Sequence, residues 1–477
     1  MSVKPPPAPP RDAGRLVNPV IRRYMETTNL ERFYGGYVIA PLQEGVYNLG
    51  IGEVGAIPLA TPLYELYKRF IQSDELSRLA LRYSGTHGER ETNRAVAARL
   101  NGWLGVERFH HGLVVSVDGG QNAAEVAVRS FTAPLGSPAW TKQYVLLAAP
   151  CYPYFSAIVS SQAGLQSFLA YDGEMLAAGV ERFCNPAVGL ILLNVPHNPM
   201  GYGLSVAQVE RINRVAQHHD CALLVDVVYA NYARDVEVGR ALGRLDPERT
   251  IFSDSFSKQY GYPGLRLGFA VSAAERLTYA MRFVKMSESL TPSNVKLAFA
   301  GHLLDHHADI PARIAREVTA RHDRFMAAFR PAAHLDVRPF GGRPNPFYLA
   351  VDVGALVRRT GLSEAQIADH LLTAHRVKVF PGQFIYPNAA LAHETFTDVG
   401  RPAGAGPLPF APPRFAPGAQ IVYAPDYFTG RIPLLRLSFG METRMEEAAA
   451  VLGQGLAAVW DGAAQHLLEK AVHTQHA

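Results

Sequence analysis

The stretch Ser255-Phe256-Ser257-Lys258, followed in the chain by Arg266, is the most informative part of this sequence. The guanidinium fork of an arginine and the O–H donors of serines suit the oxygens of a phosphate group. A lysine forms a Schiff base with an aldehyde when its amine is neutral, and a neighbouring cation and partial desolvation both favour the neutral amine. A phosphate and an aldehyde on one small molecule indicate pyridoxal 5′-phosphate as the cofactor.

The sequence around this stretch alternates between apolar runs and amphipathic segments, from about residue 60 to residue 330. Such alternation predicts βαβ units, and therefore an α/β fold with a mostly parallel sheet. Ser205 is expected to cap a helix, because Val206, Val209 and Ile212 fall near one helical face. The runs predicted as buried strands are residues 113–117, 144–149, 188–193, 222–225, 250–252 and 267–271.

The pattern changes after about residue 333 and predicts a second, smaller α/β domain. Residues 388–430 are rich in Pro, Gly and Ala and show little periodicity, and loops of that length are often functional. The expected elements here are strands over residues 349–353 and 377–380 and helices over 363–374 and 443–468. The expected domains are an N-terminal arm over 1–45 with about the first 15 residues disordered, a large cofactor-binding domain over 60–330, and a small domain from 46–59 and 331–477 that carries the insertion 388–430.

Composition excludes several classes of protein. The chain has 477 residues and a net charge of +4, without a basic run interleaved with aromatics, so a nucleic-acid partner is not indicated. The longest apolar run, residues 188–193, is too short to span a bilayer, and the proline-rich N-terminus lacks the apolar core of a signal peptide. The odd count of three cysteines argues against a disulfide framework. We expect a cytoplasmic protein that binds neither nucleic acid nor membrane.

Polar residues follow the predicted strands, at the sheet edge where open parallel sheets bind ligands. A carboxylate at the pyridine nitrogen keeps the ring protonated and able to accept electrons from a substrate carbanion, and Asp226 is the candidate. Tyr229 and Asn198 suit the ring oxygen, and Tyr152 suits the ring face. Glycines before a helix leave backbone N–H groups open to a phosphate, and Asp118-Gly119-Gly120-Gln121 precedes a predicted helix.

With these residues in this order, the chain resembles class I/II aminotransferases of the pyridoxal phosphate fold type I. The resemblance runs from about Tyr47 to the C-terminal helix. Its matching pieces are Asn198-Pro199-Met200-Gly201, Asp226-x-x-Tyr229, Ser255-x-Ser257-Lys258, Arg266-Leu267-Gly268 and Arg436-Leu437-Ser438-Phe439. It implies a large domain with a mostly parallel sheet of the seven-stranded type flanked by helices, transamination of an α-amino acid through a Schiff base and a quinonoid or carbanion intermediate, and a homodimer with shared active sites.

The resemblance also implies a role for each matching residue. Lys258 would form the Schiff base and move protons, with Asp226 at the pyridine nitrogen and Tyr229 and Asn198 at the ring oxygen. Tyr152 would stack on the ring. The phosphate would be held by Gly120, Gln121, Ser255, Ser257 and Arg266, and Tyr83 would reach the phosphate of a neighbouring subunit. Arg436 would grip the substrate α-carboxylate, with Gly52, and Asn198 would also face the substrate; no metal is expected.

A second chemistry with the same cofactor stays open. Residues 289–294, where residues that select the substrate side chain often lie, contain no arginine, so an acidic substrate is not supported. The insertion 388–430 is longer than expected for the family. A β- or γ-elimination, a replacement or a carbon–carbon bond-forming reaction of specialised biosynthesis, with a bulky activated amino acid, is the alternative to transamination.

Three other interpretations fail on the sequence. Residues 50–55 satisfy the pattern GxGxxG, but Pro58 and Pro62 interrupt the helix that a dinucleotide fold requires there. The adjacent pairs His110-His111 and His218-His219 point their side chains apart and do not suggest a metal site. The short proline-rich N-terminus leaves no room for the DNA-binding module of an aminotransferase-like regulator.

Overall fold

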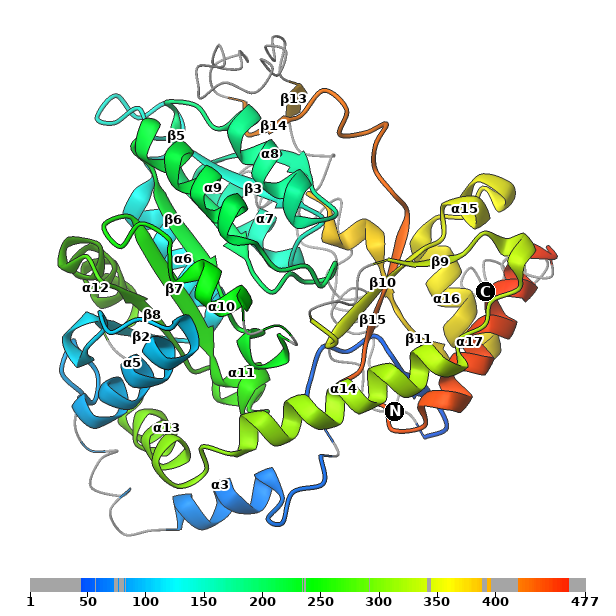
Figure 1. Cartoon of the computed structure of the whole chain (residues 1–477), viewed down its shortest axis with the longest axis horizontal. Coiled ribbons are helices and arrows are strands. Elements are labelled where there is room, and N and C mark those ends of the chain that lie inside the picture. The colour runs from blue at the N-terminus through cyan, green and yellow to red at the C-terminus, as the bar shows by residue number, and fades with distance from the viewer. Residues whose placement is uncertain are drawn as a thin grey trace, which may run out of the picture.

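The computed structural model describes residues 44–462, apart from 56, 73–75, 77–80, 82, 234, 236, 291, 341–344, 388–392 and 396–418. Nearly all of the predicted N-terminal arm, most of the predicted insertion and the end of the predicted C-terminal helix therefore lie outside the described residues. Figure 1 shows a larger part built on one wide sheet and a smaller part with a sheet of its own, with the long helix α14 (Ile310–Ala328) running along both.

The wide sheet has nine strands among the described residues, in the order β13-β14-β4-β3-β5-β6-β7-β8-β2. Strands β8 and β2 run antiparallel to their neighbours, and the other pairs are parallel. Its strands are β2 (Val114–Val117), β3 (Tyr144–Ala149), β4 (Gly164–Leu169), β5 (Val188–Asn194), β6 (Ala222–Asp226), β7 (Thr250–Ser255), β8 (Gly268–Ser272), β13 (His393–Thr395) and β14 (Ile421–Tyr423). The predicted α/β fold with a mostly parallel sheet is confirmed, and β13 and β14 extend the seven-stranded core beyond β4.

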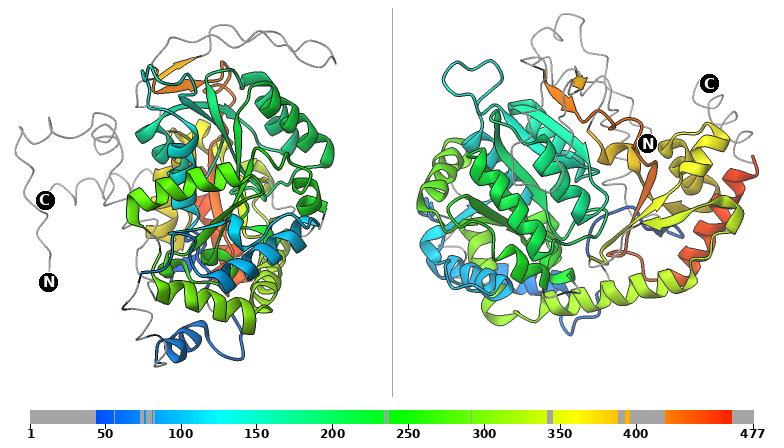
Figure 2. Two further views of the ribbon diagram at one scale, coloured as in Figure 1. Left: turned by 90° about the vertical axis from the view of Figure 1, so that its left-hand side faces the viewer. Right: turned by 45° about the horizontal axis from the view of Figure 1, so that its top comes forward.

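Helices cover both faces of this sheet, as the right-hand view of Figure 2 shows. The predicted cap of α9 is present, because the Ser205 hydroxyl accepts from the backbone N–H of Gln208 and the Gln208 side chain accepts from the backbone N–H of Ser205. The helices of the larger part are α3 (Leu63–Ile71), α5 (Arg90–Leu104), α6 (Gly120–Phe131), α7 (Pro153–Gln162), α8 (Gly173–Phe183), α9 (Val206–His218), α10 (Glu237–Leu242), α11 (Phe256–Gln259), α12 (Glu275–Ser289) and α13 (Asn294–His306).

The smaller part contains a four-stranded sheet in the order β12-β15-β10-β9. Helix α14 (Ile310–Ala328) leads into it from the larger part and packs against α17. Its remaining elements are β9 (Arg338–Phe340), β10 (Tyr348–Asp352), α15 (Gly354–Thr360), α16 (Glu364–His375), β11 (Val377–Lys378), β12 (Phe380–Pro381), β15 (Leu434–Ser438) and α17 (Met445–Trp460). The predicted strand over 377–380 is in fact two short strands that belong to different sheets, since β11 pairs with β1 (Tyr47–Asn48).

The two strands β13 and β14 lie within the predicted insertion, yet β14 pairs in parallel with β4 of the wide sheet. Residues 421–423 thus belong to the sheet of the larger part, although they come late in the chain. The domain boundaries that we expect from the sequence stay a prediction.

Candidate active site

A cavity of about 610 Å³ lies where the carboxyl ends of the parallel strands of the wide sheet face the smaller part. Twelve of the thirteen residues singled out by sequence line it: Gly52, Gly120, Gln121, Tyr152, Asn198, Asp226, Tyr229, Ser255, Ser257, Lys258, Arg266 and Arg436. Tyr83 does not line it, and its side chain is 88% exposed. The fold therefore brings together residues that are spread over almost four hundred positions of the chain.

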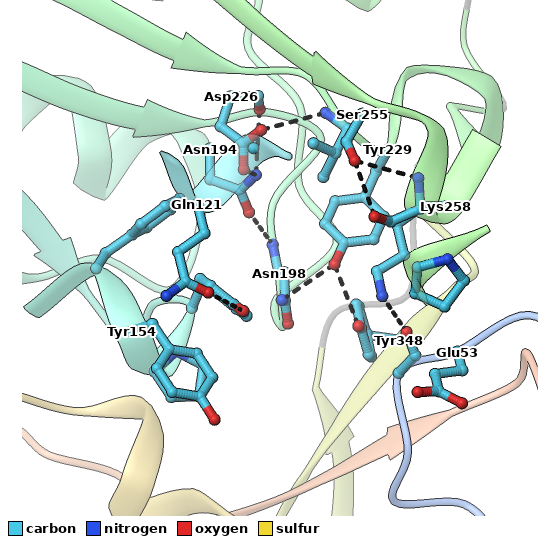
Figure 3. A pocket seen from close by; sticks show the side chains of 18 of the residues that line it. Glu53, Gln121, Tyr154, Asn194, Asn198, Asp226, Tyr229, Ser255, Lys258 and Tyr348 are labelled. Carbon is cyan, nitrogen blue, oxygen red and sulfur yellow. Dashed lines mark hydrogen bonds between the residues drawn. The ribbon is translucent and has the colours of Figure 1, made fainter. Parts of the chain in front are cut away.

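Asp226 ends β6 and is buried between the ends of the two neighbouring strands. Its carboxylate accepts hydrogen bonds from Asn194 Nδ2 at 3.0 Å and Ser253 Oγ at 3.3 Å, as Figure 3 shows in part. Burial raises the pKa of Asp226 to about 7, and the nearby charge of Asp254 also raises it, whereas the hydrogen bonds from Val228 N–H, Ser253 and Asn194 lower it. A cation placed beside Asp226 would therefore restore the carboxylate at neutral pH.

A short chain of hydrogen bonds joins Asn198, Tyr229 and Tyr348. Asn198 Nδ2 donates to Tyr229 Oη at 3.3 Å, and Tyr229 Oη donates to Tyr348 Oη at 3.1 Å. The carbonyl oxygen of the Asn198 side chain is buried and has no hydrogen-bond partner among the residues that the structure describes. Since an unpaired buried acceptor is costly, this oxygen indicates a place for a donor from a ligand.

Lys258 belongs to the one-turn helix α11 that follows β7. Its ammonium Nζ donates to the carbonyl oxygen of Gly52, and Figure 3 shows the amine extending into the cavity. The Ser255 hydroxyl caps this turn by accepting from the backbone N–H of Ser257, and it also donates to Ser257 Oγ at 2.9 Å. The two hydroxyls and the amine thus lie on one short segment.

The start of α6 lines the same cavity as Ser255, Ser257 and Lys258. Gly119 precedes the helix with a φ of +89°, a conformation that favours glycine, and an added Cβ there would lie 2.8 Å from Arg266 Nη2. Arg266 Nη2 in turn donates to the backbone oxygen of Asp118 at 3.3 Å. The free N–H groups at the start of α6, the arginine and the two serine hydroxyls together provide the donors that a phosphate requires.

Arg436 lies on β15 of the smaller part, opposite Phe380 in the sheet. Its guanidinium carbon is 4.2 Å from the centre of the Phe380 ring and 4.6 Å from the centre of the Tyr348 ring. Arg436 Nη2 donates to Gly50 O at 3.2 Å, while Nε is buried and finds no partner in the described part of the chain. Two aromatic rings therefore hold a buried, incompletely paired guanidinium at the cavity, as a carboxylate-binding arginine requires.

The loop that carries Gly52 is held between both parts of the molecule. Asn48 Oδ1 accepts from the backbone N–H groups of Gly50 and Ile51, at 3.3 and 3.2 Å. A Cβ on Gly52 would lie only 2.3 Å from Tyr348 Oη, so this position needs glycine. Close packing of the loop against Tyr348 fixes the carbonyl that meets Lys258.

These observations fit pyridoxal phosphate. The cavity combines an amine for its aldehyde, a buried carboxylate for its ring nitrogen, donors for its phosphate and an aromatic wall at Tyr152, whose hydroxyl donates to Gln121 Oε1 at 3.5 Å. The Asn198 amide supports the same conclusion, because Nδ2 uses one N–H on Tyr229 Oη and has a second N–H to offer the ring oxygen of the cofactor.

Sequence reasoning missed several residues that line or shape this cavity. Tyr348 and Phe380 carry no local motif, and only the pairing of β10, β12 and β15 brings them beside Arg436. Asn194 had a usable signal, since it ends the predicted strand over 188–193, next to the strand that ends at Asp226. Glu53 and Glu125 also line the cavity.

Comparison with known proteins identifies the family. The model of the aminotransferase class I and II family matches residues 44–390. A putative aminotransferase, YugH of Bacillus subtilis, is 23% identical over 356 residues, which cover 73% of this chain and 86% of the relative. Aromatic-amino-acid aminotransferase 2 of Thermococcus litoralis is 23% identical over 71% of this chain and 84% of its own.

Solved structures share the fold at low sequence identity. N-succinyldiaminopimelate aminotransferase of Mycobacterium tuberculosis has a TM-score of 0.66 and 19% identity, with 92% of this chain and 100% of that chain covered. Aspartate aminotransferase of Thermus thermophilus with maleate has a TM-score of 0.63 and 18% identity, with 93% and 97% covered. The fold, the cavity and the family match agree, and the chain belongs to the class I and II aminotransferases, which are pyridoxal phosphate enzymes.

Proposed function

We propose that the protein moves the amino group of an α-amino acid to a 2-oxo acid in the cavity around Lys258. The observation that carries this proposal is the meeting of Lys258, Asp226 and Arg436 in one cavity, from three different strands or strand ends. An amine, a buried carboxylate and a carboxylate-binding arginine are the groups that this chemistry needs.

The cofactor would be held at both ends by residues of the wide sheet. Its phosphate would lie among Gly120, Gln121, Ser255, Ser257 and Arg266. Pyridoxal phosphate supplies an aldehyde for Lys258 and a protonated ring that withdraws electrons from the substrate α-carbon. Asp226 would keep the ring nitrogen protonated, because the positive N–H lowers the pKa that burial has raised.

Lys258 and Arg436 would then act on the substrate. The Arg436 guanidinium would bind the α-carboxylate with two parallel N–H···O bonds, which orient the α-carbon. Lys258 Nζ would accept the α-proton as a general base and later return it as a general acid. Tyr229 would hold the ring oxygen by its hydroxyl, and the close-packed loop at Gly52 would exclude water from the Lys258 side.

The proposal is tested by measuring the visible absorption of the loaded protein and the 2-oxo acid that it forms. Protein supplied with pyridoxal phosphate should absorb in the visible and convert amino donor to 2-oxo acid, while Lys258→Ala loses both properties and Lys68→Ala, an exposed lysine of α3, keeps both. Release of a side-chain leaving group without amino transfer would instead support elimination or replacement. Normal turnover by Lys258→Ala would contradict the proposal.

We also propose that the protein is a homodimer with shared active sites. The face of α12 exposes Tyr279, Phe283 and Met286, with side chains 72%, 64% and 42% exposed, at helical spacing. Tyr83 is exposed as well. The segment that follows Tyr83 lies near α12, because the pKa of His87 is lowered by burial and, to a smaller extent, by the charge of Arg282 on this helix. A second copy is the occupant that would bury this apolar face and bring Tyr83 to the partner's phosphate.

Sedimentation of the cofactor-loaded protein tests the dimer. The protein should sediment as a dimer, and Phe283→Glu should shift it to monomer with loss of activity, whereas Tyr64→Glu, on another exposed helix, should leave the dimer intact. A monomeric, fully active wild type would contradict shared sites.

A cytoplasmic location is likewise proposed. Within the described part of the chain, no helix has the length and apolarity needed to cross a membrane. The three cysteines are buried free thiols, as a reducing compartment would keep them. Fractionation of the native host, with the protein found among membrane or exported proteins, would contradict this placement.

A further inference from the structure

The charges on the wall of the active-site cavity are unequal. Its acidic lining residues are Glu53, Asp118, Glu125 and Asp226, and its basic lining residues are Lys258, Arg266 and Arg436. The proposed function already uses each of the three basic residues, for the aldehyde, the phosphate and the α-carboxylate. The dianionic phosphate would add further negative charge to this corner of the molecule.

Two of the acidic residues have partners in this arrangement. Asp226 faces the ring nitrogen of the cofactor in the proposed function. Asp118 Oδ2 is 2.6 Å from Lys285 Nζ, and Lys296 Nζ lies 3.8 Å from its other oxygen. These two carboxylates therefore need nothing from a substrate.

Glu53 and Glu125 remain. Within the described part of the chain, neither carboxylate forms an ion pair or a side-chain hydrogen bond. Glu53 follows Gly52, whose carbonyl meets Lys258, and in Figure 3 it lies on the Lys258 side of the cavity, across from Gln121 and Tyr154. Glu125 lies in the second turn of α6 and lines the same cavity.

Lys378 is close enough to Glu53 for the two charges to interact, but it does not line the cavity. Its Nζ is buried and has no hydrogen-bond partner within the described ranges. Burial lowers the pKa of Lys378, and the charge of Glu53 opposes this only as the smaller effect. Lys378 thus makes no direct contact that would neutralise Glu53.

Buried polar atoms without partners in the described ranges indicate that this cavity binds a ligand. Arg436 Nε and Asn198 Oδ1 are buried polar atoms with which no described residue forms a hydrogen bond, and Arg436 and Asn198 are only 5% and 1% exposed. Aromatic rings of Tyr152, Tyr154 and Phe155 line the wall near α6, and faces of aromatic rings attract cations as carboxylates do. The unpaired carboxylates therefore belong to a site with independent signs of ligand binding.

We infer that the amino-acid substrate carries a positively charged side chain, which Glu53 and Glu125 receive after Arg436 has bound the α-carboxylate. This inference rests on the proposed function and names its substrate class. The charge can be an ammonium, a guanidinium or a sulfonium, because carboxylates and aromatic faces recognise the charge rather than one group. A substrate with an anionic side chain would meet two uncompensated carboxylates and be rejected.

Matched pairs of amino acids test the inference, since each pair differs mainly in charge. Arginine against citrulline and S-methylmethionine against methionine should each show a ratio of kcat/KM of about ten to a hundred in favour of the cation, as loss of a charge-assisted contact implies. Glu53→Gln and Glu125→Gln should each reduce this ratio, mainly by raising KM for the cation. Glu248→Gln, on the exposed outer surface, is the matched control and should keep the ratio.

Binding without turnover gives a second readout. The des-amino analogues of arginine and citrulline cannot donate an amino group, and calorimetry should show tighter binding of the guanidinium compound to the loaded protein. Equal or better binding and turnover of the neutral partners, with amino transfer otherwise intact, would overturn the inference and leave the proposed function standing. If no amino acid reacts although the cofactor is bound, the proposed function itself fails.

Discussion

Single residues in this site are held by contacts that can be removed one at a time. Asp226 is the clearest case, because its buried carboxylate would pair with the positive ring nitrogen of the cofactor. Its pKa is raised to about 7 by burial, from an ordinary value near 3.8. A carboxyl group with a raised pKa stabilises the folded protein at low pH, and this contribution is lost as the pH rises toward the raised pKa.

Asp226→Asn should therefore have opposite effects on cofactor-free and loaded protein. Without cofactor, the melting temperature of the variant should improve relative to wild type as the pH rises from 4 to 8, since the variant has no carboxylate to ionise there. Loaded variant should lose activity by on the order of 10²–10³, because the ring nitrogen loses its counter-charge. Melting curves at several pH values check the first effect; a constant difference between the proteins would show that Asp226 does not titrate as expected.

Tyr348 offers a second test at this scale, because its hydroxyl and its ring contact different partners. Tyr348→Phe removes the hydroxyl that accepts from Tyr229 and should lower kcat about tenfold, the size of effect expected from the loss of one buried hydrogen bond. It should leave KM for the amino acid nearly unchanged, since the ring still lies against Arg436. Tyr348→Leu removes the ring too and should raise KM; equal KM values in the two variants would show that the ring does not position Arg436.

The elements around the site show which sequence signals were sufficient. Strands β3, β5, β6 and β7 were predicted to within a few residues, because each contains an apolar run that is followed by a proline or a polar residue. Strand β4 was missed, since Gln166 and Ser167 interrupt its apolar pattern. Both are buried and hydrogen-bonded: Gln166 Oε1 accepts from Asn185 Nδ2 at 2.7 Å, and Ser167 Oγ donates to Leu147 O at 3.0 Å. Partners that distant cannot be inferred from one local window.

The same limit applies to the site. The residues on the strand ends of the wide sheet were predictable, because chain order and strand direction place them at one edge. Tyr348 and Phe380 were not, since their position depends on a sheet formed by strands more than fifty residues from Arg436.

Helix α9 provides a prediction at the scale of an element. Ser205→Ala removes the hydroxyl that accepts from the Gln208 N–H, one half of the capping box, and should destabilise the protein by about 1 kcal/mol. Ser205→Asp keeps an acceptor at the cap and should stay near wild type. Unfolding in urea measures both; since α9 contributes no lining residue to the cavity, activity should remain unchanged.

At the scale of the whole molecule, β14 is a strand from late in the chain that pairs with β4 of the wide sheet. Val422 is buried and pairs with Gln166 of β4. Val422→Asp places an unpaired charge in the sheet and should destabilise the protein by about 3 kcal/mol or more, whereas Val422→Thr should cost much less. Thermal unfolding that is equal for the two variants would show that β14 adds little to the wide sheet.

The late position of β14 also matters during synthesis on the ribosome. Strand β4 emerges more than 250 residues before the segment that covers its outer edge. Until then, its open backbone groups can pair with another nascent chain. Slow translation or a premature stop before residue 421 should therefore increase aggregation of the polypeptide. This should hold even though the cavity residues from Gly52 to Arg266 have already been synthesised by then.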